Sequence, residues 1–209
     1  MKRALQILLI LLIVGLGYIL FESIMSPIRF DREKNFRYER VISRLKEIRD
    51  AQVLYKSVHG RYTAGFDTLI TFVKSGDVPV VRAIGNIPEE FIDSLKSRTK
   101  AEQLALKLGL ITRDTIRVPV MDSLYKDNPS GPDSMQYIPF SGGKKFNLGT
   151  ADVKASGLIV NVFESSALNN DILRGLNEQL IVNLNDGKPF PGLRVGSLTE
   201  SNNNAGNWE

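Results

Sequence analysis

Residues 31–60 read DREKNFRYERVISRLKEIRDAQVLYKSVHG, and this stretch decides the fold. Apolar side chains recur along it every three or four residues, the spacing that gathers them on one face of an α-helix. They are Tyr38, Val41 or Ile42, Leu45, Ile48, Ala51 or Gln52, Tyr55 and Val58. Charged residues fill the other faces, and Gly60 is a candidate C-cap. We expect a long amphipathic helix whose apolar stripe packs either on its own domain, the commoner case, or on other copies of the chain.

Upstream of this helix, residues 4–21 form an uncharged apolar run, ALQILLILLIVGLGYILF. A helix over this run is about 27 Å long, close to the roughly 30 Å of a bilayer's hydrocarbon core. Tyr18 and Phe21 fall where an aromatic belt would lie, and Glu22 marks the return to water. We predict that residues 1–26 are a membrane anchor, that the span covers about residues 4–21, and that membrane lipid is a partner.

The apolar run also resembles a cleaved signal peptide, because Lys2 and Arg3 precede it and two glycines lie near its end. However, the run continues to Phe21, past the point where cleavage would fall, and Pro27 disfavours cleavage after Ser26. An uncleaved anchor is therefore the favoured prediction.

The orientation of the anchor depends on which charges are counted. The basic residues that follow the run outnumber Lys2 and Arg3, and a literal count would keep the body inside the cell. A short basic tail followed at once by an apolar run is also how an exported signal anchor begins. We favour export, which makes the chain a single-pass inner-membrane protein with a periplasmic body.

The rest of the chain reads as an α+β fold with a mainly antiparallel sheet, because helical patterns come first and strand patterns later. We divide it into residues 27–75, a long amphipathic helix with a short second helix, and residues 76–209, an α+β soluble body. The predicted helices are Phe66–Lys74, a helix from a capping box at Thr99–Glu102 to Gly109, and a turn at Asp171–Leu176. The predicted strands are Val78–Ile84, Thr115–Val120, Met135–Phe140, Lys144–Leu148, Gly157–Phe163 and Leu193–Val195, with a loop at Asn128–Asp133.

Composition excludes several classes of function. The chain has no cysteine, so it has no disulfide and no thiolate site. Its net charge of +4 comes without a long basic run, so we expect no nucleic acid partner. His59 is the sole histidine and fits a helix C-terminus, and residues 141–145, SGGKK, fit a hairpin turn better than a phosphate loop. We expect no enzymatic activity.

Two segments resemble a known family. Residues 51–62, AQVLYKSVHGRY, followed by FDTL, and the ending NNNAGNWE resemble the type IV pilin-like proteins, and in particular the major pseudopilins of type II secretion. In that family a prepilin is cut after a glycine that precedes the apolar run. Here Gly17, Tyr18 and Glu22 have the matching spacing, but the apolar run lies before Gly17 and not after it, so we expect no such processing. The resemblance implies a structural or assembly role in the cell envelope, with a role in secretion, and self-association or other envelope proteins as partners.

The resemblance also implies a calcium site in the C-terminal tail, where Glu200, Asn202, Asn203 and Asn204 are the candidate ligands. The favoured alternative is that these residues make turns by bonding their own backbone. Asp122, Asp127 and Asp133, around the predicted loop, are a second set of oxygen ligands. Apart from calcium, no cofactor is expected. Trp208 is predicted to pin the tail onto the body, with its N–H paired.

The alternative function is a membrane-anchored module that binds an envelope partner or polymer. It differs from an assembly protein in needing an exposed patch or groove on the body, whereas an assembly protein needs a helix that meets its own copies.

Overall fold

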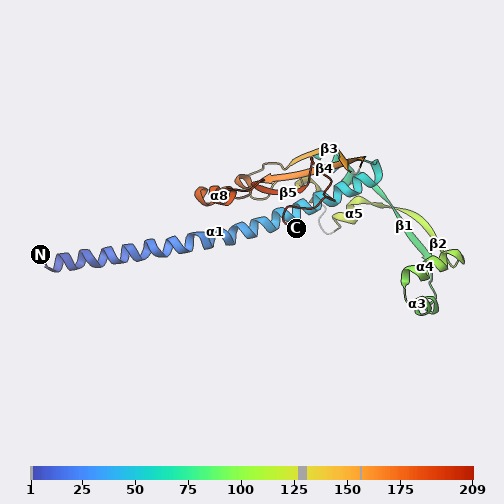
Figure 1. Ribbon diagram of the computed structural model, residues 1–209, viewed down its shortest axis with the longest axis horizontal. Coiled ribbons are helices and arrows are strands. Elements are labelled where there is room, and N and C mark those ends of the chain that lie inside the picture. The colour runs from blue at the N-terminus through green and yellow to red at the C-terminus, as the bar shows by residue number, and fades with distance from the viewer. Residues whose placement is uncertain (1, 127–130, 156) are drawn as a thin grey trace.

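The structure, a computed structural model, describes residues 2–126, 131–155 and 157–209. It has an α+β fold in which one very long helix carries a small body at its C-terminal end (Figure 1). The helices are α1 (Lys2–His59), α2 (Phe66–Ser75), α3 (Glu89–Leu95), α4 (Arg98–Lys107), α5 (Val120–Leu124), α6 (Gly131–Ser134), α7 (Asn169–Ile172) and α8 (Glu178–Asn185). The strands are β1 (Asp77–Gly85), β2 (Ile111–Pro119), β3 (Asn147–Ala155), β4 (Leu158–Leu168) and β5 (Gly192–Gly196).

Helix α1 joins the two helices that the sequence predicted on either side of Pro27. It runs without a break from Lys2 to His59 and contains Pro27 in its interior. It ends as expected at Gly60, whose φ of 75° is left-handed and whose N–H donates to the Lys56 carbonyl at 2.8 Å.

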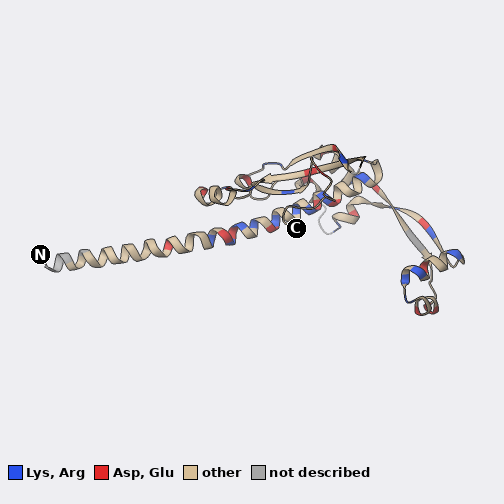
Figure 2. Ribbon diagram, in the orientation of Figure 1, with Lys and Arg blue, Asp and Glu red and all other residues tan. Residues whose placement is uncertain are grey.

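The two halves of α1 have different surroundings. Residues 2–29, which we call the membrane-side half after the span that the sequence predicts there, project away from the body, and Figure 2 shows few charges along them. Their apolar side chains are exposed, for example Leu12 at 53% and Ile13 at 65%. The helix is long and apolar enough to cross a membrane, with a mean hydropathy of 2.1 over its most apolar window. The chain therefore has one candidate span within the residues described.

Residues 30–59, the body-side half, lie under the sheet. Val41, Leu45, Ile48 and Ala51 are fully buried, which confirms that the apolar stripe packs on the chain's own body. Gln52 is also fully buried, and it exchanges two hydrogen bonds with the backbone of Thr63. A buried amide is stable only when it is paired, so this exchange holds the turn after α1 against the helix.

The sheet that covers this half is antiparallel and has the order β3-β4-β5. Strands β4 and β5 contact α1. Phe163 and Val195, one from each of these strands, are fully buried in the same core as Leu45. The Gly157–Phe163 and Leu193–Val195 predictions are confirmed.

Strands β1 and β2 form a separate two-stranded antiparallel sheet that leaves the body as an arm and carries α3 and α4 at its tip (Figure 1). The predicted strand at Val78–Ile84 is confirmed, although it includes Pro79. Val80 pairs with Ile116 in the register, and both are partly exposed, at 43% and 37%. Directly opposite residues share a side of the sheet, so one side of the arm carries uncovered apolar residues.

Several local predictions are wrong. The helix predicted between Thr99 and Gly109 is present as α4, but the capping box is wrong. Thr99 lies inside α4, which starts at Arg98 with Ser97 as N-cap and no side-chain cap hydrogen bond. Residues 144–146 lie outside any strand, although Lys145 makes an isolated bridge, and β3 starts at Asn147 and extends to Ala155. Glycines at 142 and 143 with positive φ delay the strand start. Strand β3, with the sequence NLGTADVKA, is too polar to show the apolar alternation that marks a strand.

Other differences concern short elements. Residues 135–140 form no strand, but Tyr137 makes one isolated bridge to Lys145. Strand β2 ends at Pro119, and Val120 begins a helix. The helical turn expected at 171–176 begins earlier, at Asn169. Part of the predicted loop at 128–133 lies outside the described residues, and Gly131–Ser134 is helical.

Candidate functional site

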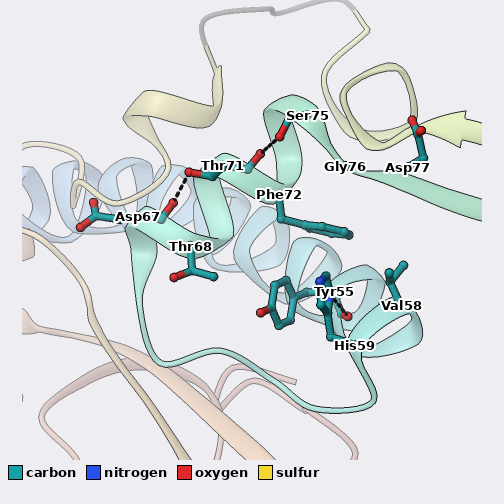
Figure 3. A pocket seen from close by; sticks show the side chains of 10 residues that line it. All are labelled: Tyr55, Val58, His59, Asp67, Thr68, Thr71, Phe72, Ser75, Gly76 and Asp77. Carbon is teal, nitrogen blue, oxygen red and sulfur yellow. Dashed lines mark hydrogen bonds between the residues drawn. The ribbon is translucent and has the colours of Figure 1, made fainter.

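An open groove of about 610 Å³ lies between the end of α1 and helix α2. We call it the aromatic groove (Figure 3). It is lined by Tyr55, Val58, His59, Asp67, Thr68, Thr71, Phe72, Ser75, Gly76 and Asp77. It lies at the end of α1 that is remote from the membrane-side half, beside the root of the arm (Figure 1).

The rings that line the groove are positioned by the helical spacing of Tyr55 and His59 and by the small size of Gly76. Tyr55 and His59 are four residues apart on α1, so their rings lie on the same face of the helix. Phe72 comes from α2, and its ring lies against Gly76. A Cβ on Gly76 would lie 2.6 Å from the nearest atom of the Phe72 ring, so glycine is needed there for the ring to keep its place.

The floor of the groove is a cluster of three rings, Tyr55, His59 and Phe72, which we call the aromatic floor. The Tyr55 and His59 rings stack with centroids 4.1 Å apart and planes inclined by 13°. Phe72 meets both edge-on, at 5.2 Å from Tyr55 and 5.5 Å from His59. Such pairs stabilise one another by about 0.5–1.5 kcal/mol beyond the area they bury. Phe72 is itself buried, so the exposed part of the floor belongs mainly to His59 and Tyr55.

The polar groups of the groove divide into bonded and outward-facing ones. The hydroxyls of Thr71 and Ser75 donate to carbonyls one turn earlier in α2, both at 2.8 Å. The Nδ1 of His59 lies 3.2 Å from the carbonyl oxygen of Tyr55. Asp67 and Asp77 stand toward opposite ends of the groove (Figure 3). Both side chains are directed away from the three rings in this view, so the carboxylates lie at the rim of the groove.

The sequence did not single out this groove. The sequence pattern places Tyr55 in the helix stripe and His59 at a helix C-terminus, and it gives Phe72 no part in the apolar face of its helix. The spacing of Tyr55 and His59 was a usable signal, but nothing in the sequence brings α2 back across the end of α1.

Three of the four predicted calcium residues line a hollow of about 150 Å³, and Glu200 does not. Asn202, Asn203 and Asn204 line it, together with Tyr62 and Lys56. Asn203 and Asn204 have left-handed backbone, with φ of 54° and 58°, as turn-forming asparagines do. Lys56 brings a positive charge to the same hollow, which opposes a cation there.

The side chains of this tail are partly engaged already. Asn202 donates from Nδ2 to the Ala205 carbonyl at 3.2 Å, and Asn204 donates to the Tyr62 hydroxyl at 3.0 Å. Glu200 is exposed. A calcium ion would therefore have to compete with the turn's own hydrogen bonds.

The second predicted set of carboxylates does not come together in the described part of the chain. Asp133 is bound by the Lys74 ammonium at 2.6 Å, and Asp122 is exposed on α5. Asp127 lies outside the described residues. Among the described side chains, no group of three or more His, Cys, Asp or Glu is placed to hold a metal.

The C-terminal tail is docked, as the sequence predicted. Gly206 bridges to Val195 of β5, and Trp208 packs against the core. A Cβ at Gly206 would lie 2.4 Å from the indole, so the ring rests directly on this glycine. The predicted pairing of the indole is wrong, because Nε1 is buried without a hydrogen-bond partner among the described residues. The indole therefore holds the tail by apolar contact alone.

The last residue also ties the tail to α1. Glu209 accepts a hydrogen bond from the Arg49 guanidinium at 2.8 Å, and this contact lowers the pKa of the Glu209 carboxyl. Nearer the membrane-side half, Arg37 donates to the carbonyls of Ile172 and Arg174. Tyr38 donates to Asn169, and burial raises the pKa of its hydroxyl. Side chains of α1 thus form hydrogen bonds with the body at both ends of the segment in which the helix and the body are in contact.

Comparison with known proteins adds no family: no protein-family model, curated protein or solved structure matches the chain.

Proposed function

We propose that this is a non-enzymatic, single-pass protein of the cell envelope, anchored in the inner membrane, whose pilin-like or pseudopilin-like body serves an assembly role in the periplasm, in a machinery such as a type II secretion system. The observation that supports it is α1 itself. One unbroken helix exposes an apolar half and buries one face of its other half against an antiparallel sheet. A rigid helix of this kind couples a span in the lipid directly to a body outside it.

The assembly role requires that copies, or other envelope proteins, meet along the exposed side of α1. Ile24 is 63% exposed and Val53 is 45% exposed, one on each half of the helix. Because the chain lacks cysteine, single cysteines at these positions would report contacts without background.

The test is disulfide cross-linking in intact cells that produce Ile24→Cys or Val53→Cys. We expect cross-linked dimers or larger species from at least Ile24→Cys, and none from Asn183→Cys on the exposed face of α8. Assembly along α1 would be contradicted if both helix variants stay monomeric after oxidation and form no disulfide with another protein.

Export is tested separately with a reporter fused after Glu209. Activity only outside the cytoplasm supports the periplasmic body. Activity in the cytoplasm would mean that the literal count of basic residues, and not the signal-anchor pattern, sets the orientation.

A second candidate function is a membrane-anchored binding module. The aromatic groove and the uncovered apolar side of the arm favour it, since both lie on the body away from the membrane-side half (Figure 1). Exposed apolar surface of this kind is typical of interaction sites.

A further inference from the structure

The outer edge of strand β5 is covered by the chain's own C-terminal tail. Strand β5 ends the sheet order β3-β4-β5, so one of its edges faces away from the sheet. On that edge the Gly196 N–H donates to the Ala205 carbonyl at 3.0 Å. The Asn207 N–H donates to the Arg194 carbonyl, also at 3.0 Å. The side chain of Asn207 adds two bonds, accepting from the Arg194 N–H at 3.0 Å and donating to the Gly192 carbonyl at 2.9 Å. The tail therefore acts as a short additional strand on β5.

Two side chains of the tail extend this fit beyond the backbone. The Trp208 ring packs against the core, and Glu209 accepts a hydrogen bond from the Arg49 guanidinium at 2.8 Å. The contacts comprise hydrogen bonds, one ion pair and apolar packing, and the chain has no cysteine that could fix the tail covalently. The surface formed by β5 and α1 therefore accepts this sequence in the same way whichever copy of the chain supplies it.

The turn that returns the tail to β5 is strained. Among the described residues, four non-glycine positions have positive φ, and two of them, Asn203 and Asn204, are adjacent in this turn, with φ of 54° and 58°. Left-handed backbone is unfavourable for a residue that carries a Cβ, although asparagine tolerates it better than most. The Ala205 N–H donates to the Asn202 carbonyl at 3.1 Å and closes the turn. An extended backbone at these positions would remove the strain.

The docked tail also carries a cost at the indole of Trp208. Its Nε1 is buried without a hydrogen-bond partner among the described residues. An unpaired buried donor raises the free energy of the docked state, because water could satisfy it once the tail is released. Release of the tail is therefore less unfavourable than its contacts alone would make it.

We propose that the tails of two copies exchange, so that residues 205–209 of one copy dock on β5 and Arg49 of a second copy. This inference rests on the assembly role proposed above. Exchange of an identical element keeps every tail contact, so the balance between the closed and the exchanged forms depends on strain in the hinge and on the local concentration of copies. The exchanged hinge, residues 197–204, becomes extended and loses the two left-handed asparagines.

Length and symmetry permit the exchange between copies in one membrane. Fully extended, residues 197–204 span about 26 Å, close to the roughly 30 Å diameter of a small domain. A two-fold axis parallel to α1 relates two copies whose membrane-side halves point the same way, as anchoring in one membrane requires. The proposed anchor also confines the copies to a thin layer, which raises their effective concentration.

The test places one cysteine on each side of the contact between β5 and the tail. Residues 194 and 207 lie opposite one another, next to the bridge between Val195 and Gly206. The Cα atoms of such pairs are about 4.5–5.5 Å apart, within reach of a disulfide. Full-length Arg194→Cys and Asn207→Cys chains, carrying different tags, are produced together in intact cells and oxidised. We expect a mixed disulfide that joins the two tagged chains.

Two controls accompany this pair. The double variant Arg194→Cys with Asn207→Cys should form the disulfide in either arrangement and shows that the tail is docked. Arg194→Cys produced with Asn183→Cys, which is exposed on α8, should give no mixed disulfide above background. Loss of the side-chain hydrogen bonds of Asn207 weakens the closed and the exchanged forms alike, so it does not bias the result.

Variants of the hinge give the direction of the equilibrium. Asn203→Gly removes the Cβ from a left-handed position and should lower the yield of mixed disulfide about threefold, because it relieves the closed turn. Asn203→Pro fixes φ near −65°, which the closed turn does not allow, and should raise the yield about threefold. Lys96→Gly, at a left-handed position on the arm, is the matched control and should leave the yield unchanged.

A double variant that forms its disulfide, together with single variants that form no mixed disulfide, would overturn the exchange, as would a double variant that stays reduced. A yield that Asn203→Gly and Asn203→Pro leave equal would overturn the hinge argument and the proposal with it. Failure of the exchange is distinguishable from failure of assembly. Dimers of Ile24→Cys without the mixed disulfide would keep assembly along α1 and remove the exchange of tails.

Discussion

The two halves of α1 belong to one helix and both carry apolar residues, yet the apolar side chains are exposed in one half and buried in the other. Leu12 in the membrane-side half is 53% exposed, whereas Leu45 in the body-side half is fully buried. The difference lies in the rest of the sequence around them: residues 4–21 are apolar on every side, and residues 31–60 on one face only. A helix that is apolar all round fits lipid, whereas a stripe fits a sheet.

The strongest test of this difference between the two halves is to place the same charge in each of them. Leu45→Asp should destabilise the body by about 3–5 kcal/mol, because it puts an unpaired carboxylate in a closed apolar core. The melting temperature of the full chain in micelles measures it. Val53→Asp, on the exposed side of the same helix, is the control and should stay within about 0.5 kcal/mol.

The same substitution in the membrane-side half should act on insertion and not on folding. Leu12→Asp is expected to cost about 3 kcal/mol of membrane insertion, because it places a charge near the centre of the span. The fraction of chain that resists carbonate extraction measures this, and the melting temperature of the body should not move. A loss of body stability would show that α1 transmits damage across Pro27.

The tail extends the body-side half, and its removal should have a smaller effect. Trp208→Ala is expected to cost about 2 kcal/mol, since the ring is only partly buried, and to expose residues 198–209 to protease. Limited proteolysis followed by mass spectrometry gives the cut sites. A tail that is cut at the same rate with and without Trp208 would mean that the indole does not hold it.

Calcium offers a finer test of the same tail. If Glu200 and Asn202–Asn204 bind Ca²⁺, a concentration ten times the dissociation constant should stabilise the folded chain by about 1.4 kcal/mol. The melting temperature should then rise with millimolar calcium, and Glu200→Gln should reduce the rise. An unchanged melting temperature would remove calcium and leave the docking of Trp208 in place.

The smallest expected effect is the pH dependence of the tail's tie to α1. Contact with Arg49 lowers the pKa of Glu209 from its ordinary value of 4.5. The contact therefore contributes its full stabilisation above about pH 4.5 and loses it as the pH falls through the lowered pKa. We therefore expect proteolysis of the tail to become faster as the pH falls below about 4.5. Glu209→Gln should abolish this pH dependence, whereas Glu178→Gln should preserve it.

Much of the secondary structure could be predicted because local patterns carry it. The stripe through Leu45 and Ile48, the apolar face of α2 and the compact run of β4 each repeat at the period of their element. The wrong predictions of secondary structure also have local causes. Thr99 sits in a sequence that fits a capping box, but Ser97, two residues earlier, takes the N-cap position. Strand β3 is too polar to show an alternation.

The sequence by itself determined the long helix, its division into a lipid-compatible half and a striped half, and the antiparallel character of the body, because periodicity and run length depend only on neighbouring residues. Only the tertiary structure decided that α2 folds back so that Phe72 meets Tyr55 and His59, that an arm leaves the body after Gly76, and that Lys56 stands in the same hollow as Asn202–Asn204. Those groups come together because segments distant in sequence pack against one another. Such packing depends on residues far apart in the chain, so no local sequence pattern can predict it.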